Sequence, residues 1–230
     1  MITCSVCGQR NDDLVVLCTS CRSYLQTKVD NLNLFETIWQ LIESPRAAHK
    51  KIVLARHKNY VLPLSCLLGM SLIFALFWSW NLGTRFDNVL ILLGAGGLLG
   101  IPLGLGFVFV SGMLIVGGIR LLGGKALLKD SRAIVSYASM PLSLSLVLIL
   151  PLEVAIFGTD FFGTNPPPMI INPVVYVALL GFDALAILWS VLLLYQGVSV
   201  LSGFGKLKSI GVTLMATLIP ATLSFGLKTI

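Results

Sequence analysis

Four cysteines near the N-terminus are the residues with the most evident chemistry. They follow a C-x2-C-x10-C-x2-C pattern, formed by Cys4, Cys7, Cys18 and Cys21. Each Cys-x-x-Cys turn can direct two thiolates at one centre, and two such turns complete the tetrahedral sulfur shell that Zn²⁺ prefers. Because four thiolates close that shell, no position is left for a catalytic water. The spacing therefore predicts a structural zinc site, with a redox dithiol or two disulfides as alternatives.

The cysteines belong to a small polar head, which we predict to be a zinc ribbon over residues 1–30. Gly8 follows Cys7 directly and suits the tight turn of a zinc knuckle. Residues 14–17, Leu-Val-Val-Leu, are expected to form one short strand. A head this short cannot bury enough apolar surface to fold alone, so the metal would supply the free energy of folding. A docking module and a purely structural staple are both open interpretations of the head.

A basic amphipathic neck is predicted over residues 31–58. Asn33 is placed to cap a first helix whose apolar residues recur at helical spacing. Basic stretches directly before a membrane span usually lie on anionic headgroups. The predicted headgroup contacts are Lys50, Lys51, Arg56 and Lys58. Nucleic acid is the rival ligand and is not expected so close to a bilayer, and His49 and His57 are expected at the interface rather than as metal ligands.

The chain is too apolar for a water-soluble protein, and residues 59–230 are predicted to form its membrane body. Of the 230 residues, 56% are hydrophobic and 11% are charged, with a mean hydropathy of +0.92, whereas soluble domains carry about 25% charged residues. A helix needs about 20 apolar residues to cross the hydrocarbon core of a bilayer. Five segments approach or exceed that length: Tyr60–Trp80, Val89–Ile119, Ala133–Phe157, Pro173–Leu201 and Ile210–Leu227. The predicted fold class is an all-α polytopic membrane protein with five transmembrane helices.

Basic residues in the loops predict how these helices are oriented. Lys and Arg gather before the first segment, between the second and third, and between the fourth and fifth. The loop over residues 158–172 contains neither. Because basic loops stay in the cytoplasm, this alternation places the N-terminus in the cytoplasm and the C-terminus outside.

The second apolar segment is long and rich in glycine. A hairpin of two short spans turning at Ile101-Pro102 would invert every later loop against the charge rule, so a single helix, tilted or kinked at Pro102, is predicted. Gly96, Gly100 and Gly104 recur every four residues on one helix face and allow another helix to approach closely. That second helix could belong to the same chain or to another subunit of a homo-oligomer.

Two acidic residues lie inside apolar segments. Glu153 is near the outer end of the third segment, and Asp183 is about ten residues into the fourth. Ionisable groups inside a bilayer are costly, which makes both residues candidates for an intramembrane polar site. Asp183 could instead pair with Arg85 or stay protonated, and a packing role is favoured because ion pathways usually contain several such groups.

Residues 38–230 resemble the Yip family of Ypt/Rab-interacting membrane proteins, and in particular its prokaryotic-type members. The matching stretches are Ser44-Pro45-Arg46, residues 56–62, Gly123-Gly124-Lys125, residues 137–141 and residues 201–206. The resemblance implies five spans with a cytoplasmic N-terminus, in a prokaryotic cytoplasmic membrane or, in a eukaryote, the ER and Golgi. Binding to Rab GTPases is not carried over, because no partner-binding motif is matched.

These features predict a non-enzymatic membrane organiser or adaptor with a cytoplasmic zinc head. Its expected partners are the lipid bilayer and a further membrane or cytoplasmic protein. The alternative is a small-solute or ion transporter or channel that uses the polar groups of the third and fourth spans. An enzyme is not expected, because the sequence offers no catalytic triad, no clustered carboxylates and no open metal position.

Overall fold

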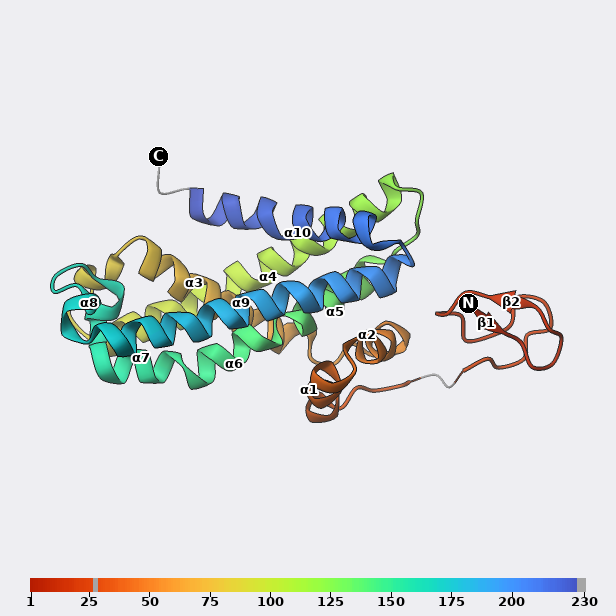
Figure 1. The fold of residues 1–230 in the computed structure, drawn as a ribbon, viewed down its shortest axis with the longest axis horizontal. Coiled ribbons are helices and arrows are strands. Elements are labelled where there is room, and N and C mark those ends of the chain that lie inside the picture. Colours follow the sequence, from red (N-terminus) through yellow and green to blue (C-terminus); the bar gives the residue numbers. More distant parts are fainter. Residues whose placement is uncertain (27–28, 227–230) are drawn as a thin grey trace.

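A computed structural model describes residues 1–26 and 29–226, with side chains up to residue 222. It consists of a bundle of long helices and, beyond one end of the bundle, a small head that contains the N-terminus (Figure 1). The head is built mostly of turns, and two short helices lie at the same end of the bundle. The predicted arrangement of a cysteine-bearing head before a helical membrane body is confirmed.

The head contains a two-stranded antiparallel sheet. β1 (Ile2–Thr3) pairs with β2 (Arg10–Asn11), so the two strands flank the first Cys-x-x-Cys turn. The strand expected over residues 14–17 is wrong, since Leu17 forms only an isolated bridge to Tyr24. The reason lies just before it: Asp12 Oδ1 accepts a hydrogen bond from the Leu14 N–H at 3.0 Å, and such a turn bends the chain where a strand would begin.

The neck forms two helices, α1 (Leu34–Glu43) and α2 (Pro45–Leu54). Asn33 caps α1 as predicted, its Oδ1 accepting from the Glu36 N–H at 3.4 Å. α2 packs against two helices of the body, α5 (Leu128–Ala138) and α9 (Pro173–Ser202). The second neck helix is therefore attached to the body along its length.

The body contains the remaining elements. In chain order these are α3 (Val61–Ser79), η1 (Leu82–Arg85), α4 (Val89–Leu121), α5, α6 (Met140–Leu148), α7 (Leu150–Phe157), η2 (Gly158–Phe162), α8 (Pro168–Ile171), α9 and α10 (Lys206–Gly226). Within the described residues, four helical segments are long and apolar enough to span a membrane: α3, α4, α9 and the run Leu128–Phe162. The fifth predicted span, Ile210–Leu227, lies within α10 except for its last residue, which falls outside the described part, and the count of five stays a prediction.

Prolines act differently in the second and third spans. α4 runs unbroken through Pro102 over 33 residues, so the alternative hairpin at Ile101-Pro102 does not form. At 1.5 Å per residue it is about 50 Å long, more than the roughly 30 Å of a hydrocarbon core. The third span is divided instead, because Pro141 and Pro151 lie at the starts of α6 and α7, and a proline has no N–H to continue the preceding helix.

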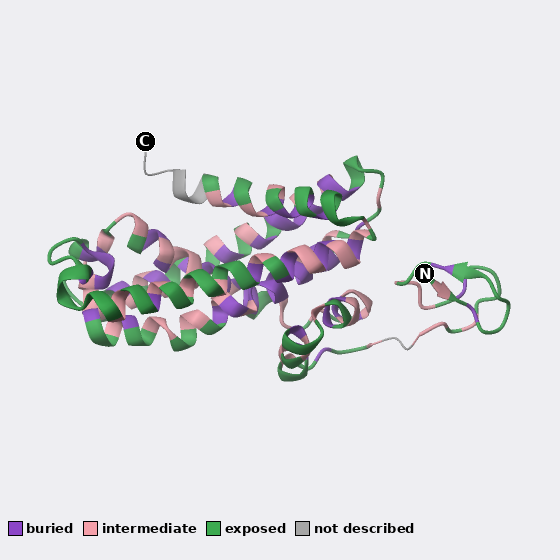
Figure 2. Cartoon of the chain, in the orientation of Figure 1, coloured by how far each residue is buried: buried purple, intermediate pink, exposed green. Residues whose placement is uncertain are grey.

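The body has two cores. The larger one joins α2 to the bundle and includes Ile52, Ile115, Ile134 and Val198, all essentially inaccessible. The smaller one is aromatic, at the far end of the bundle, and contains Phe74, Phe77, Phe157, Phe161 and Phe162. The outer sides of the long helices are largely exposed and apolar (Figure 2). Lipid is the environment that covers such a surface.

Candidate metal centre and intramembrane site

The four cysteines of the head converge on one point. All four Sγ atoms lie within 4.8 Å of one another. Cys4 and Cys21 approach to 3.6 Å between their Sγ atoms, and Cys7 and Cys18 to 3.5 Å. A regular tetrahedron with Zn–S bonds of about 2.3 Å places sulfur atoms about 3.8 Å apart. The cysteines are free thiols, so the geometry is that of a metal-binding shell and not of two disulfides.

Both Cys-x-x-Cys turns close in the same way. After Cys7, the N–H of Gly8 donates to the Cys4 carbonyl at 2.9 Å, and Gly8 has a φ of +71°. After Cys21, the N–H of Arg22 donates to the Cys18 carbonyl at 3.0 Å, and Arg22 has a φ of +59°. The turn at Gly8 follows the prediction. The equivalent conformation at Arg22 carries a cost that glycine does not have.

Hydrogen bonds to sulfur prepare the shell for a cation. The Ser23 hydroxyl, 3.0 Å from Cys4 Sγ, is the main cause that lowers the pKa of Cys4 to about 6, helped by the N–H of Cys7. The N–H of Gln9 donates to Cys7 and lowers its pKa. The neighbouring thiol of Cys21 and burial act in the opposite direction, and together they raise the pKa of Cys7 to about 11. Crowded thiols resist becoming thiolates together unless a positive ion lies between them. The residues present therefore fit a bound metal cation.

Asn11 is a supporting residue that the sequence pattern did not reveal. It is buried, and its Oδ1 accepts from the Thr19 N–H and Thr19 hydroxyl, both at 2.9 Å. Its Nδ2 donates to the Gln9 carbonyl at 2.9 Å and reaches Cys18 Sγ at 3.5 Å. Asn11 thus ties the second knuckle to β2. No spacing rule marks such a residue, because two of its four partners are backbone groups.

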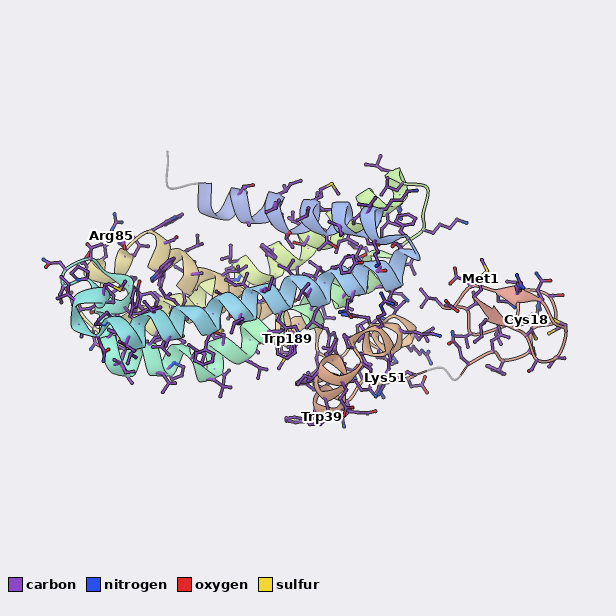
Figure 3. The ribbon with its side chains drawn as sticks, viewed as in Figure 1. Met1, Cys18, Trp39, Lys51, Arg85 and Trp189 are labelled. Carbon is purple, nitrogen blue, oxygen red and sulfur yellow. The ribbon has the colours of Figure 1, made fainter. Side chains whose placement is uncertain are left out.

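The four lysines and arginines expected at the headgroups are placed in different ways. Arg56 is exposed and Lys50 is partly exposed. Lys51 Nζ lies 2.6 Å from Glu36 in α1 (Figure 3). These three remain accessible from outside the bundle.

Lys58 differs because its ammonium points inward. Its side chain is 10% exposed and lies 3.1 Å from a carboxylate oxygen of Asp130, which is 9% exposed. It also donates to the carbonyls of Ile52 and Val53 in the last turn of α2. Burial lowers the pKa of Lys58, and Asp130 opposes that shift. The end of α2 has carbonyls without helical partners, and a cation there is favourable, so Lys58 caps the neck helix instead of meeting lipid.

His49 is also placed inside the protein, contrary to the expectation of an interface residue. It is fully buried on the face of α2 that meets α9, where a Cβ added to Gly197 would lie 3.0 Å from its Nδ1. Neither ring nitrogen makes a hydrogen bond. Burial lowers the pKa of His49 to about 4, with a small opposing contribution from the Leu193 backbone. The imidazole is therefore neutral and acts as part of the core. His57, in contrast, is exposed.

The glycine face of α4 lies against helix α3 of the same chain. A Cβ on Gly104 would lie 1.9 Å from the Ser65 carbonyl oxygen, and one on Gly100 would lie 2.6 Å from the Met70 Cα. Gly96 faces the ring of Phe74, and a Cβ on Gly96 would lie 2.4 Å from the Phe74 Cζ. α3 contributes Gly69 to the same contact. The structure thus places this close approach within the chain.

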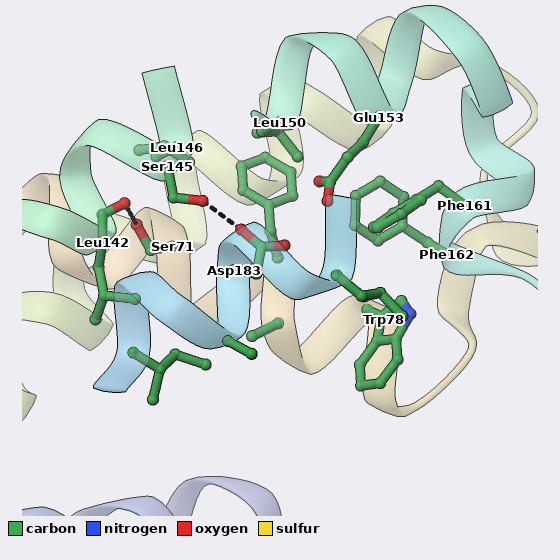
Figure 4. A pocket seen from close by; sticks show the side chains of 15 residues that line it. Ser71, Trp78, Leu142, Ser145, Leu146, Leu150, Glu153, Phe161, Phe162 and Asp183 are labelled. Carbon is green, nitrogen blue, oxygen red and sulfur yellow. Dashed lines mark hydrogen bonds between the residues drawn. The ribbon is translucent and has the colours of Figure 1, made fainter. Parts of the chain in front are cut away.

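Asp183 and Glu153 line one pocket of about 380 Å³ between α3, α6, α7, η2 and α9 (Figure 4). The Ser145 hydroxyl donates to Asp183 Oδ1, and the Glu153 carboxyl lies in the same pocket. Glu153 is 3% exposed and its Oε1 has no hydrogen-bond partner. Among the described residues, the ion pairs do not include one between Asp183 and Arg85.

The helical body matches a known protein family. The family model described as the Yip1 domain matches residues 39–227, well over half of the chain. The chain belongs to the Yip1 family. No curated protein and no solved structure matches it. The resemblance in the sequence is confirmed at the level of the family, and its prokaryotic type stays a prediction.

The family match separates the two candidate sites. The cysteines all precede residue 39, so the metal centre lies outside the Yip1 domain, whereas the carboxyl pocket lies within it. Sequence spacing was enough to find the metal centre, because its ligands are close along the chain. The sequence offered Glu153 and Asp183 as candidates for an intramembrane polar site, but the part of Ser145 was missed, because Ser145 and Asp183 are 38 residues apart. The polar positions on two apolar segments were the available signal, but no rule pairs them.

Proposed function

We propose that the chain is a non-catalytic membrane adaptor that presents a zinc-binding head in the cytoplasm. The observation that carries this proposal is the closed shell of four thiols on a head that stands outside the Yip1 domain. Zinc is the cation proposed, because four thiolates in a tetrahedral arrangement suit it and provide no open coordination position. The shell can stabilise a fold but offers no site for metal-assisted chemistry.

The surface of the head supports a docking role over a purely structural one. Val6, inside the first Cys-x-x-Cys turn, is 72% exposed, and Tyr24, after the second, is 79% exposed. Apolar side chains in such turns contribute nothing to the core of the head. Exposed aromatic and aliphatic residues on a rigid support are typical anchors for a protein partner.

The neck would hold the head close to the membrane surface. Phe35 and Trp39 are 83% and 62% exposed on α1, and Figure 3 shows Trp39 on the side that faces away from the bundle. Aromatic residues of this kind insert at the level of the headgroups. Lys50, Lys51 and Arg56 are the cations proposed to contact anionic headgroups beside them.

Crosslinking in cells, followed by purification in detergent, tests the adaptor role. We expect the intact chain to capture a defined protein, and Cys18→Ser to lose that protein because the head has lost its metal. Cys66→Ser is the matched control, because Cys66 lies in α3 and outside the shell. Equal capture by the Cys18→Ser variant and the intact chain would contradict the proposal.

A transporter or channel for a small solute or ion is the second candidate. It is favoured by one observation, the two carboxyl groups from the third and fourth spans that line the same pocket. A flux into proteoliposomes that is abolished by Asp183→Asn, in a protein of normal elution profile, would favour this function over the adaptor. No flux, or a flux unaffected by the substitution, would exclude a role for Asp183 in transport.

A further inference from the structure

We propose that the pocket between α3, α6, α7, η2 and α9 binds an organic ammonium ion, with its charge at Glu153 and Asp183 and its apolar part against the aromatic wall. This inference is separate from the adaptor role, because it concerns a site inside the Yip1 domain that the zinc head does not touch. It holds whether or not the ligand crosses the membrane.

The charged groups of the pocket favour a cationic ligand. The pocket brings together two carboxyl groups, and no Lys, Arg or His is among its described lining residues. Among the described residues, the Ser145 hydroxyl of α6 donates to Asp183, and the Oε1 of Glu153 is buried without a hydrogen bond. A carboxyl oxygen buried without a partner is costly. A ligand that carries N–H donors or a positive charge is the complement that the protein itself does not supply.

The walls of the pocket are largely aromatic. Phe74, Trp78, Phe161 and Phe162 all line the pocket. Figure 4 shows the Glu153 carboxyl beside the rings of Phe161 and Phe162, with Trp78 on the same side. Aromatic faces attract ammonium groups, and the combination of such faces with a carboxylate is how proteins recognise alkylated amines.

These walls disfavour an inorganic cation. Ca²⁺ takes six to eight oxygen ligands and Mg²⁺ keeps an octahedral shell of oxygens. Besides the two acids, the lining offers only the hydroxyls of Ser71 and Ser145, and Ser71 already donates to the Leu142 carbonyl at 3.1 Å. Most of the remaining surface is hydrocarbon, which cannot replace the hydration shell of a metal ion.

The opening and the volume of the pocket limit which ligand can enter. Trp78 and Ile187 belong to the lining and are 39% and 53% exposed on the outer surface of the bundle. A ligand would therefore enter from the apolar side, where lipid surrounds the helices. A volume of about 380 Å³ is at the small end of the range for ligand pockets, roughly 300–1,000 Å³. An ammonium group with a short apolar chain fits these limits, and it could come from a free amine or from the amine headgroup of a lipid.

The test uses the full chain in maltoside micelles, which contain no ammonium group. Binding of hexyltrimethylammonium is measured by calorimetry, with hexanoate as a probe of equal chain length and opposite charge. We expect saturable binding of the ammonium and none of hexanoate. Glu153→Gln and Asp183→Asn should each weaken binding at least tenfold, because each keeps the shape of the side chain and removes its charge. Asp160→Asn is the matched control, since Asp160 lies in η2 but outside the lining, and it should bind as the unchanged protein does.

Lipids and ions provide the remaining arms. Native mass spectrometry after mixing with phosphatidylethanolamine or phosphatidylglycerol separates the two sources: retention of the amine lipid alone indicates a headgroup, and binding of the free probe alone indicates a free amine. Equal binding of hexanoate, displacement of the probe by equimolar Ca²⁺, or full binding by both acid variants would overturn the proposal. The elution profile shows whether each acid variant folds. If one of them fails to fold, the other still tests the proposal.

Discussion

The burial of His49 predicts that the neck separates from the body as the pH falls. The pKa of His49 is lowered from 6.5 to about 4 by burial. When α2 leaves the body, the imidazole reaches water and regains its ordinary pKa. Between these two values the separated state binds a proton that the packed state does not, so acid favours separation. The contribution of His49 to packing is complete above about pH 6.5, decreases as the pH falls, and is constant again below about pH 4.

The size of this effect follows from the same two values. One pKa unit corresponds to 1.36 kcal/mol, so the interval from 6.5 to about 4 corresponds to about 3 kcal/mol. The free energy of packing would fall by that amount, and the equilibrium between the packed and the separated neck would change by about 300-fold. The burial of the ring is complete, so solvent does not reduce this contribution in the packed state.

Hydrogen exchange of the amides of α2, corrected for the pH dependence of chemical exchange, measures the separation. We expect the protection of Ala48–Leu54 to fall between pH 7 and pH 4.5 in the unchanged protein. His49→Leu should make protection nearly independent of pH in this range, because leucine does not titrate. His57→Leu is the matched control, since His57 is exposed in the same segment, and it should behave as the unchanged protein does. An unaltered pH dependence in His49→Leu would refute the reasoning.

Three further predictions concern the head, the helix contact and the orientation. Purified protein should contain one zinc ion per chain by elemental analysis, and Cys18→Ser should lose this ion while the body keeps its elution profile. A metal-free chain with disulfides would contradict both the metal site and the cytoplasmic location of the head. Gly104→Ala should lower thermal stability by about 1–3 kcal/mol, because the new atom would lie 1.9 Å from a backbone oxygen of α3, whereas Gly106→Ala, with nothing within 4 Å, should have little effect. A reporter fused after Ile230 should be external and one near Lys125 cytoplasmic; the same side for both would rule out this topology.

The features that the sequence predicted best depend on residues that are close along the chain. The cysteine spacing alone indicates the metal shell, because each pair of ligands lies within one turn. Long apolar segments indicate spans because a bilayer requires length and composition only. Gly96, Gly100 and Gly104 share a face by the geometry of any α-helix, although only the structure shows that α3 fills it.

The features that were missed depend on contacts between distant segments. The inward direction of Lys58 requires Asp130 of α5 beside it, and the burial of His49 requires α9. A basic amphipathic pattern predicts a surface helix, and it cannot reveal that one face is covered by another part of the same chain. The position of Glu153 and Asp183 in one pocket similarly depends on how the third and fourth spans pack.

These contacts together give the neck a specific role. α2 is held to the body by the buried His49 and by the pair of Lys58 with Asp130, and α1 is held to α2 by Lys51 and Glu36. The Yip1 match begins at residue 39, within α1, so α2 belongs to the family domain while the metal shell does not. The neck is thus the only covalent route between the two sites. Release of α2 by protonation of His49 would therefore loosen the attachment of the head to the membrane body.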